Sequence, residues 1–382
     1  MVVKRKVEKL GAETSLLGFG AMRLATDSGG EIDYGVNREM IDKAIAGGVN
    51  YFDTAYVYHS EKSEVFLGDE LVSRYPRDSF YIATKLPTFR LTKPEQPEEM
   101  LNESLRRLKT DYIDFYLLHS LHRETWEKSK SFGAIECVEK AKRDGRIRRI
   151  GFSAHASPDE LRKIINEYDG WEFVQLQLNY ADWDIMPGIR EAYEIAVAAG
   201  IPVIIMEPVR GGSLTNPDSP AVKKIAELLP AGVTPAQAAF RWAAERQAAF
   251  VILSGMSAVS HVEENVKTFS PVTPLTDGER EAISRTVKVM KELPTVPCTA
   301  CGYCLDGCPV KIPIDDLFDG FNSYQYYGNK RHFLGYFRGE GGKPSDCTEC
   351  GACASICPQR IDVPAELKRV GALRDSLGGA AK

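Results

Sequence analysis

The sequence predicts an α/β protein: a (β/α)8 TIM barrel followed by a small, mostly helical domain. Short apolar runs alternate with helical patterns from the N-terminus to about residue 275, and there are eight such runs. Eight βα units in about 250 residues are the usual size of this barrel. A cysteine-rich region with further helical patterns follows. We therefore expect residues 1–290 to form the barrel and residues 291–382 to form the second domain.

Eight runs are expected to be strands because each is apolar on nearly every residue and rich in β-branched or aromatic side chains. This composition is typical of strands buried on both faces. The runs are residues 15–20, 49–55, 79–85, 112–119, 148–154, 173–180, 201–208 and 249–255.

Helical patterns lie between these runs. Residues 38–48 place apolar side chains at i, i+3 and i+4 and end in two glycines. A later helix is expected to begin with Ser157 as N-cap and Pro158 at its first position, and Thr234 and Pro235 have the same roles in another.

A doubly wound sheet is the competing α/β fold. It normally carries a G-x-G-x-x-G fingerprint after its first strand. Here Arg23 and Leu24 follow Met22, so the glycine spacing is absent and the barrel is favoured.

The pattern changes after residue 275. Residues 277–294 read as one amphipathic helix that stops at a proline. Three further helical segments are expected in the second domain, at residues 314–327, 330–337 and 363–377.

Composition narrows the classes of partner. The chain of 382 residues has a net charge of −5 and a pI near 5.8, which gives no electrostatic reason to bind nucleic acid. No apolar stretch approaches the ~20 residues of a membrane span, and the first residues lack the apolar core of a secretory signal. We therefore expect a cytoplasmic protein, in which nine cysteines indicate metal binding or redox use.

Eight of the nine cysteines lie in two copies of C-x2-C-x2-C-x3-C-P, at residues 298–309 and 347–358. Such runs hold [4Fe-4S] clusters, and in two-cluster ferredoxins the fourth cysteine of each run ligates the other cluster. Zinc ribbons are the alternative, but they use two C-x2-C pairs without a third cysteine or a trailing Cys-Pro. We expect one cluster on Cys298, Cys301, Cys304 and Cys357, and the other on Cys347, Cys350, Cys353 and Cys308. The region 295–365 resembles the helical two-cluster ferredoxin modules found at the ends of many redox enzymes.

Polar residues at the ends of three apolar runs suggest a catalytic site. Asp53, Lys85 and His119 end the second, third and fourth runs, and Tyr58 follows on a loop. Catalytic residues of such barrels gather at the C-terminal ends of strands. A lysine ammonium lowers the pKa of a neighbouring phenol, so Tyr58 is expected to protonate a carbonyl oxygen that His119 orients. The alternatives are an ion pair that only braces the barrel and a buried core histidine.

The same residues resemble the aldo/keto reductase family, over about residues 1–270. The family's D-T-A-x-x-Y stands here at residues 53–58, and its lysine and histidine match Lys85 and His119. The resemblance implies reduction of an aldehyde or ketone to an alcohol, or the reverse, by hydride transfer with NADP or NAD.

The resemblance also implies positions that bind the nicotinamide cofactor. These are Gly20, Met22, Ser153, Gln175, Met206, Pro208, Gly211, Gly255, Ser257, His261, Glu264 and Asn265. Four positions depart from the family's pattern. Ala154 replaces an asparagine, Met206 an aromatic residue and His261 an arginine, and the family's upstream lysine position falls near Gly255. The choice between NADP and NAD therefore stays open.

Three hypotheses describe how the barrel and the clusters could work together. In the first, the barrel is a carbonyl reductase and the clusters are structural or dock a redox partner protein. In the second, the clusters feed electrons to an unusual substrate or to a flavin, which normally mediates between hydride and single electrons. In the third, the chain is mainly an electron-transfer subunit.

Overall fold

The structure is a computed structural model of the chain, and it describes residues 1–298, 302–339, 341–357 and 359–378. Two compact units make up the chain: Met1–Gly211 with Ala236–Thr276, and Gly212–Pro235 with Asp277–Lys382. Among the described residues, no helix combines the length and the apolar character that a membrane crossing requires.

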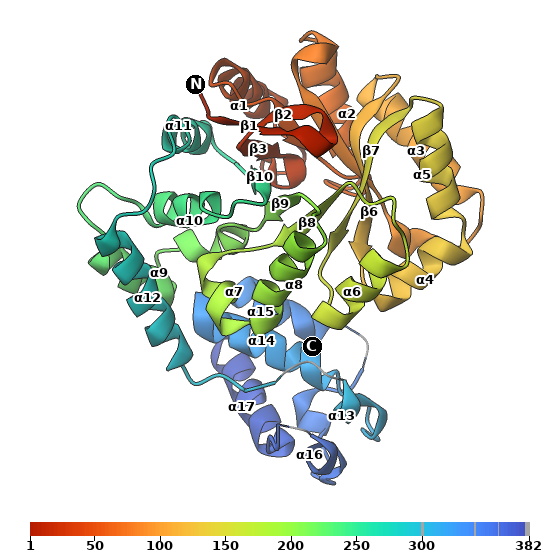
Figure 1. Cartoon of the computed structure of the whole chain (residues 1–382). Helices are drawn as coiled ribbons and strands as arrows, with labels where there is room; N and C mark the ends of the chain where they lie inside the picture. Colours follow the sequence, from red (N-terminus) through yellow and green to blue (C-terminus); the bar gives the residue numbers. More distant parts are fainter. Residues whose placement is uncertain (299–301, 340, 358, 379–382) are drawn as a thin grey trace. The chain divides into compact units, whose positions relative to one another are not determined.

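The first unit contains a closed barrel of eight parallel strands, in the order β10-β3-β4-β5-β6-β7-β8-β9 (Figure 1). Each strand overlaps one of the eight predicted runs, so the barrel prediction is confirmed. The strands are β3 (Leu17–Gly20), β4 (Tyr51–Asp53), β5 (Tyr81–Leu86), β6 (Ile113–Leu121), β7 (Ile147–Ala154), β8 (Phe173–Gln177), β9 (Val203–Met206) and β10 (Ala249–Ser254).

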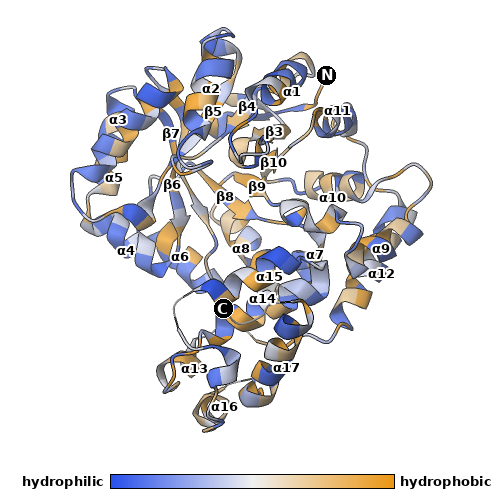
Figure 2. Ribbon diagram, turned by 180° about the vertical axis from the view of Figure 1, so that it is seen from behind, coloured by the Kyte–Doolittle hydropathy of each residue, from blue (hydrophilic) through white to orange (hydrophobic). Residues whose placement is uncertain are grey.

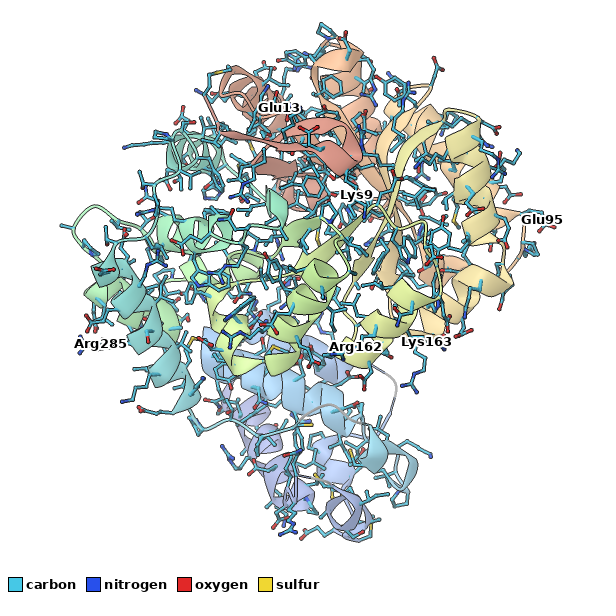
Figure 3. All side chains as sticks on the ribbon, in the orientation of Figure 1. Lys9, Glu13, Glu95, Arg162, Lys163 and Arg285 are labelled. Carbon is cyan, nitrogen blue, oxygen red and sulfur yellow. The ribbon has the colours of Figure 1, made fainter. Side chains whose placement is uncertain are left out.

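Helices surround the strands, and Figure 2 shows both polar and apolar residues along them, as expected for helices that bury one face. Charged side chains such as Glu95, Arg162 and Lys163 point outward (Figure 3). The helices are α1 (Tyr34–Ala46), α2 (Ser63–Leu67), α3 (Gln96–Leu108), α4 (Arg123–Ser131), α5 (Ala134–Arg143), α6 (Pro158–Asn166), α7 (Tyr180–Ile185), α8 (Pro187–Ala198), α10 (Pro235–Ala244) and α11 (Val259–Thr268). The predicted N-cap of α6 is confirmed, since the Ser157 side chain accepts from the Glu160 N–H and the Glu160 carboxylate accepts from the Ser157 N–H.

An antiparallel hairpin precedes the barrel and was not predicted. Its strands are β1 (Lys4–Val7) and β2 (Ala12–Ser15). Leu10 and Ala12 from the hairpin lie in one buried cluster with Phe173 and Phe250, which stand at the starts of barrel strands. The hairpin therefore closes the N-terminal end of the barrel, and the C-terminal end is left for a site.

The second unit is mostly helical, as predicted. Its helices are α9 (Pro220–Leu228), α12 (Asp277–Lys291), α13 (Tyr303–Asp306), α14 (Ile314–Tyr327), α15 (Lys330–Gly335), α16 (Ala352–Ile356) and α17 (Val363–Ser376). Phe318, Phe321, Phe333 and Val370 form part of its own buried core. Helices α9 and α12 pack together, and both belong to this unit. The expected domain boundary between residues 290 and 291 stays a prediction.

Phe115 lies in the core of the barrel among other aromatic rings. It is fully buried, and its ring lies 5.1 Å from the rings of both Tyr51 and Phe173. Replacing a buried phenylalanine with alanine typically lowers the free energy of unfolding by about 3–5 kcal/mol. We expect a loss in this range for Phe115→Ala in urea unfolding followed by circular dichroism. Val197→Ala on the exposed side of α8 should change it by less than about 0.5 kcal/mol; equal losses in both variants would contradict the packing role.

Candidate active site

Three adjacent strands bring the predicted catalytic residues together. Asp53 ends β4, Lys85 lies near the end of β5, and His119 lies on β6. These strands are neighbours in the barrel and run parallel, so their ends meet at one rim. The register pairs Asp53 with Ala83 and Lys85 with Leu117. The structure thus confirms the expected convergence of the strand ends.

Asp53 and Lys85 form a buried ion pair. Lys85 Nζ lies 2.6 Å from Asp53 Oδ1 and donates over the same distance to the Thr54 carbonyl oxygen. The Lys85 side chain is fully buried and that of Asp53 is 4% exposed. Burial disfavours the ammonium, but Asp53 and Tyr58 outweigh it and raise the pKa of Lys85. Lys85 is therefore charged at neutral pH.

Tyr58 lies against this pair, with Lys85 Nζ 5.0 Å from its ring centroid. Burial raises the pKa of Tyr58, while the charge of Lys85 and a hydrogen bond with it act in the opposite direction. Asp53 and Glu207 add to the upward shift. Lys85 acts on the phenol in the expected direction, but burial outweighs it, so the pKa of Tyr58 lies above its ordinary value instead of below it. Tyr58 is consequently a neutral phenol that can donate a proton.

His119 borders the phenol. Its ring centroid lies 5.9 Å from that of Tyr58 and 5.7 Å from that of Phe89. The pKa of His119 is lowered to about 3, mainly by burial and further by the charges of Lys85 and His155. His119 Nδ1 is buried without a partner among the described residues. A neutral imidazole beside the phenol suits a role in orienting a carbonyl oxygen.

The residues expected at the nicotinamide are brought together. Ser153 and Gln175 are paired across β7 and β8, and Gln175 Nε2 donates to Met206 Sδ at 3.5 Å. The Gln175 Oε1 atom is buried and has no hydrogen-bond partner in the described part of the chain. A buried acceptor left unpaired is unfavourable. It fits the amide N–H of a nicotinamide carboxamide, so these residues suit the cofactor.

Three glycines of the predicted cofactor set permit close approach. A Cβ atom at Gly20 would lie 3.2 Å from the Ser254 carbonyl oxygen. At Gly211 it would lie 2.5 Å from Arg23 Nη2, and at Gly255 it would lie 3.2 Å from the Arg23 side chain. Arg23 thus reaches between the loops after β9 and β10. We did not predict a role for Arg23 in the cofactor site, although a cation close after the first barrel strand, β3, could have indicated one.

The remaining cofactor positions differ in their surroundings. Met22 is 55% exposed, whereas Pro208 is buried. Ser257, His261 and Glu264 are exposed at or near the start of α11, where the Ser257 N–H donates to His261 Nδ1 at 3.4 Å. Asn265 is buried and donates to Ser254 Oγ at 3.0 Å, so it already has a structural partner. Cofactor binding by these residues stays a prediction.

Two clefts in the second unit collect the cysteines. One is lined by Cys298, Cys304 and Cys357, and the other by Cys308, Cys347, Cys350 and Cys353. Each cleft therefore combines cysteines of both runs, in the grouping that we expected. Cys301 lies outside the described residues.

The cysteines of the two clefts suit a cluster with several iron atoms. Among the residues that the structure describes, no three or more histidine, cysteine or carboxylate side chains could hold one ion together. A [4Fe-4S] cube instead takes one thiolate on each iron, so its ligands need not meet at one point. Aliphatic side chains such as Ile314 line both clefts. The donor set and its spacing fit two clusters.

A TIM barrel with this set of side chains, joined to a helical unit with two cysteine clefts, defines an oxidoreductase with an iron–sulfur domain. The sequence profile of the Aldo/keto reductase family matches residues 16–287, and that of the 4Fe-4S dicluster domain matches residues 297–361. The chain therefore belongs to the aldo/keto reductase family and carries a C-terminal dicluster domain. The family implies NAD(P)H and a small-molecule carbonyl substrate, and the dicluster domain implies two [4Fe-4S] clusters.

Relatives agree with this assignment. L-galactose dehydrogenase from Arabidopsis thaliana is 26% identical over 306 residues, which cover 74% of this chain and 95% of that protein. NADH-specific methylglyoxal reductase from Escherichia coli K12 is 26% identical over 213 residues, covering 49% and 60%. The holo form of aldo-keto reductase AKR11C1 from Bacillus halodurans superposes with a TM-score of 0.63 at 27% identity, covering 75% of this chain and 96% of that one.

The lowered pKa of His119 has a measurable consequence. Its imidazole should stay neutral between about pH 8 and pH 5, where an ordinary histidine takes up a proton. Because the unfolded chain binds that proton near pH 6.5 and the native chain does not, this group makes the native state less stable as the pH falls toward about 3. Imidazole 15N NMR, with the resonance assigned by its loss in His119→Gln, checks this. A titration midpoint near pH 6.5 would contradict it.

Proposed function

We propose that this chain reduces a small aldehyde or ketone, or oxidises the corresponding alcohol, with Tyr58 as the proton donor. The observation that carries the proposal is the buried Asp53–Lys85 pair against the Tyr58 ring, with a neutral His119 beside it. The names of the relatives, an L-galactose dehydrogenase and a methylglyoxal reductase, point to polar substrates of a few carbons. Either NADH or NADPH supplies the hydride when it is bound.

Each side chain has a distinct task in the reduction. Tyr58 gives its proton to the carbonyl oxygen, and the Lys85 ammonium stabilises the phenolate that this leaves. Asp53 holds the ammonium in place, because a lone buried charge would be unfavourable. His119 orients the carbonyl oxygen through a hydrogen bond. In the oxidation the proton returns to Tyr58 from the alcohol.

We assign the cofactor to the residues that the resemblance implied, with Arg23 added. Gln175 Oε1 is the acceptor for the carboxamide, and the Arg23 guanidinium is a cation for the pyrophosphate. Ser257, His261, Glu264 and Asn265 are proposed to contact the adenosine end of NAD or NADP.

The two cysteine clefts favour an added electron-transfer function. We propose that Cys298, Cys301, Cys304 and Cys357 hold one cluster, and that Cys308, Cys347, Cys350 and Cys353 hold the other. A hydride carries two electrons whereas a cluster moves one, so direct exchange with nicotinamide is unfavourable without a flavin. The clusters are therefore expected to exchange electrons with a redox partner protein. Cys350, which lines one cleft, is exposed to solvent.

Removal of the phenolic hydroxyl tests the carbonyl chemistry. Tyr58→Phe should lower kcat for methylglyoxal and a panel of aldehydes by about 10²–10⁴-fold, the usual contribution of a general acid. Coenzyme affinity, measured by calorimetry, should not change. Tyr34→Phe on α1 is the matched control, because its hydroxyl lies on the outside of the barrel beside Asp69. Wild-type turnover by Tyr58→Phe would refute the assigned role.

Paired cysteine substitutions test how the clusters are ligated. Cys308→Ser with Cys350→Ser removes two ligands from one proposed cluster, so about four iron atoms should remain. Cys308→Ser with Cys304→Ser removes one ligand from each cluster and should damage both. If each run instead held its own cluster, these two results would be exchanged. Iron analysis and electron paramagnetic resonance after anaerobic reconstitution distinguish the two outcomes.

A further inference from the structure

The turn that follows Tyr58 is strained. His59, Ser60 and Glu61 have φ values of 49°, 52° and 70°, so three consecutive residues other than glycine adopt the left-handed region. The left-handed region is sterically unfavourable for any residue that has a Cβ atom. Strain of this kind persists only where the surroundings enforce it, and it concentrates at functional sites.

Two arginines hold the end of this turn through Glu61. Glu61 Oε2 accepts a hydrogen bond from Arg107 Nη2 at 2.6 Å, and Glu61 Oε1 accepts from Arg90 Nη1. Arg107 comes from α3 and is 8% exposed, so this half of the interaction is largely shielded from water. The Arg90 half is more exposed, at 44%, and is correspondingly weaker.

Arg107 also holds the start of the turn. Its Nη1 atom donates to the Tyr56 carbonyl oxygen at 3.2 Å, and its guanidinium lies 4.1 Å from the centroid of the Tyr56 ring. The same Nη1 atom lies 3.3 Å from Glu64 Oε2, and Glu64 accepts from Thr84 Oγ1 at 2.6 Å. Thr84 precedes Lys85 on β5. One arginine thus fixes both sides of Tyr58 relative to the strand that carries Lys85.

Arg90 connects Glu61 to His119. It ends a short helical turn, Thr88–Arg90, in which Thr88 Oγ1 donates to the His119 carbonyl oxygen at 2.7 Å. Phe89 of this turn places its ring 5.7 Å from the His119 ring. The Glu61 carboxylate therefore links the segment that carries Tyr58 to the segment that covers His119.

We propose that Glu61 is a positioning residue: its carboxylate, held by Arg107 and Arg90, keeps the strained turn in the conformation that presents Tyr58 to Lys85. This inference rests on the proposed role of Tyr58 as proton donor. No sequence motif identified Glu61, Arg90 or Arg107 beforehand.

The proposal predicts a loss in the chemical step more than in binding. Displacement of a catalytic group by about 1 Å can lower a rate by about 10²-fold, although the substrate still binds. Glu61→Gln keeps the shape of the side chain but removes the charge that pairs with Arg90 and Arg107. Arg107 keeps its ion pairs with Glu64 and Glu103, so the variant loosens the turn without leaving this buried cation unpaired. We expect kcat to fall by about tenfold or more with 4-nitrobenzaldehyde as the probe, and the KM for NADH or NADPH to stay nearly constant. Glu61→Asp, which keeps the charge, should recover part of the rate.

A second readout does not depend on activity. The Cζ carbon of Tyr58, labelled with 13C and assigned by its loss in Tyr58→Phe, reports the titration of the phenol by NMR. Burial raises the pKa of Tyr58 in the folded chain. A loosened turn admits water, so the midpoint in Glu61→Gln should move down toward the ordinary value of about 10. Glu191→Gln, which weakens an exposed pair with Arg162 on α6, is the matched control and should change neither readout.

The outcomes separate the two hypotheses. If Glu61→Gln leaves both kcat and the Tyr58 titration as in the wild type, the positioning role is overturned. If the titration moves but the wild type reduces no carbonyl compound, the positioning role stands and the proposed function fails. If Glu61→Gln does not fold, Arg90→Gln provides the same two readouts with Arg107 in place, and unchanged values there overturn the proposal.

Discussion

The ion pair between Asp53 and Lys85 is the interaction on which the site depends. Two charges that are almost fully removed from water are stable only when each satisfies the other, and here neighbouring parallel strands place them 2.6 Å apart. The closed barrel provides this burial, because the N-terminal hairpin seals one end with Leu10 and Ala12. The charge of Lys85 then acts at the other end, where Tyr58 and His119 lie.

Burial has an opposite effect on these two groups: it raises the pKa of the phenol and lowers that of the imidazole. Both groups are consequently neutral and able to take part in hydrogen bonds at neutral pH.

A second set of charges surrounds the turn that carries Tyr58, and we propose that it fixes the position of this side chain. Arg107 contacts Tyr56, Glu61 and Glu64, which bracket Tyr58 in the sequence. The strained backbone of residues 59–61 is held by regular elements: Arg107 comes from helix α3, and Thr84, which donates to Glu64, comes from strand β5. Catalytic groups held by packed elements keep their geometry better than groups on free loops.

The sequence predicted the parts of the structure that follow from local pattern. Eight apolar runs predicted eight strands. Polar residues at their ends predicted which side chains converge, because the ends of parallel strands meet at one rim. The spacing of the cysteines also predicted which of them share a cleft. The sequence did not predict the direction of the Tyr58 pKa shift, since that depends on burial by many distant residues. Glu61 and Arg107 are 46 positions apart in the chain, and Arg107 resembles any other cation on an amphipathic helix. The N-terminal hairpin was missed because its strands, KRKV and AETS, are mostly polar and do not form an apolar run.

The transfer of hydride to carbon is the claim that joins fold, site and function, and it is also the one that an experiment reaches most directly. Coenzyme in which deuterium replaces both hydrogens at C4 of the reduced nicotinamide can be supplied under anaerobic conditions to the protein with its clusters in place, and the alcohol product analysed by mass spectrometry. Hydride transfer at the Tyr58 site predicts one deuterium on the carbinol carbon of the product. A reduced product without deuterium would contradict it, because the electrons would then have passed through a flavin or the clusters and the new hydrogen would come from water.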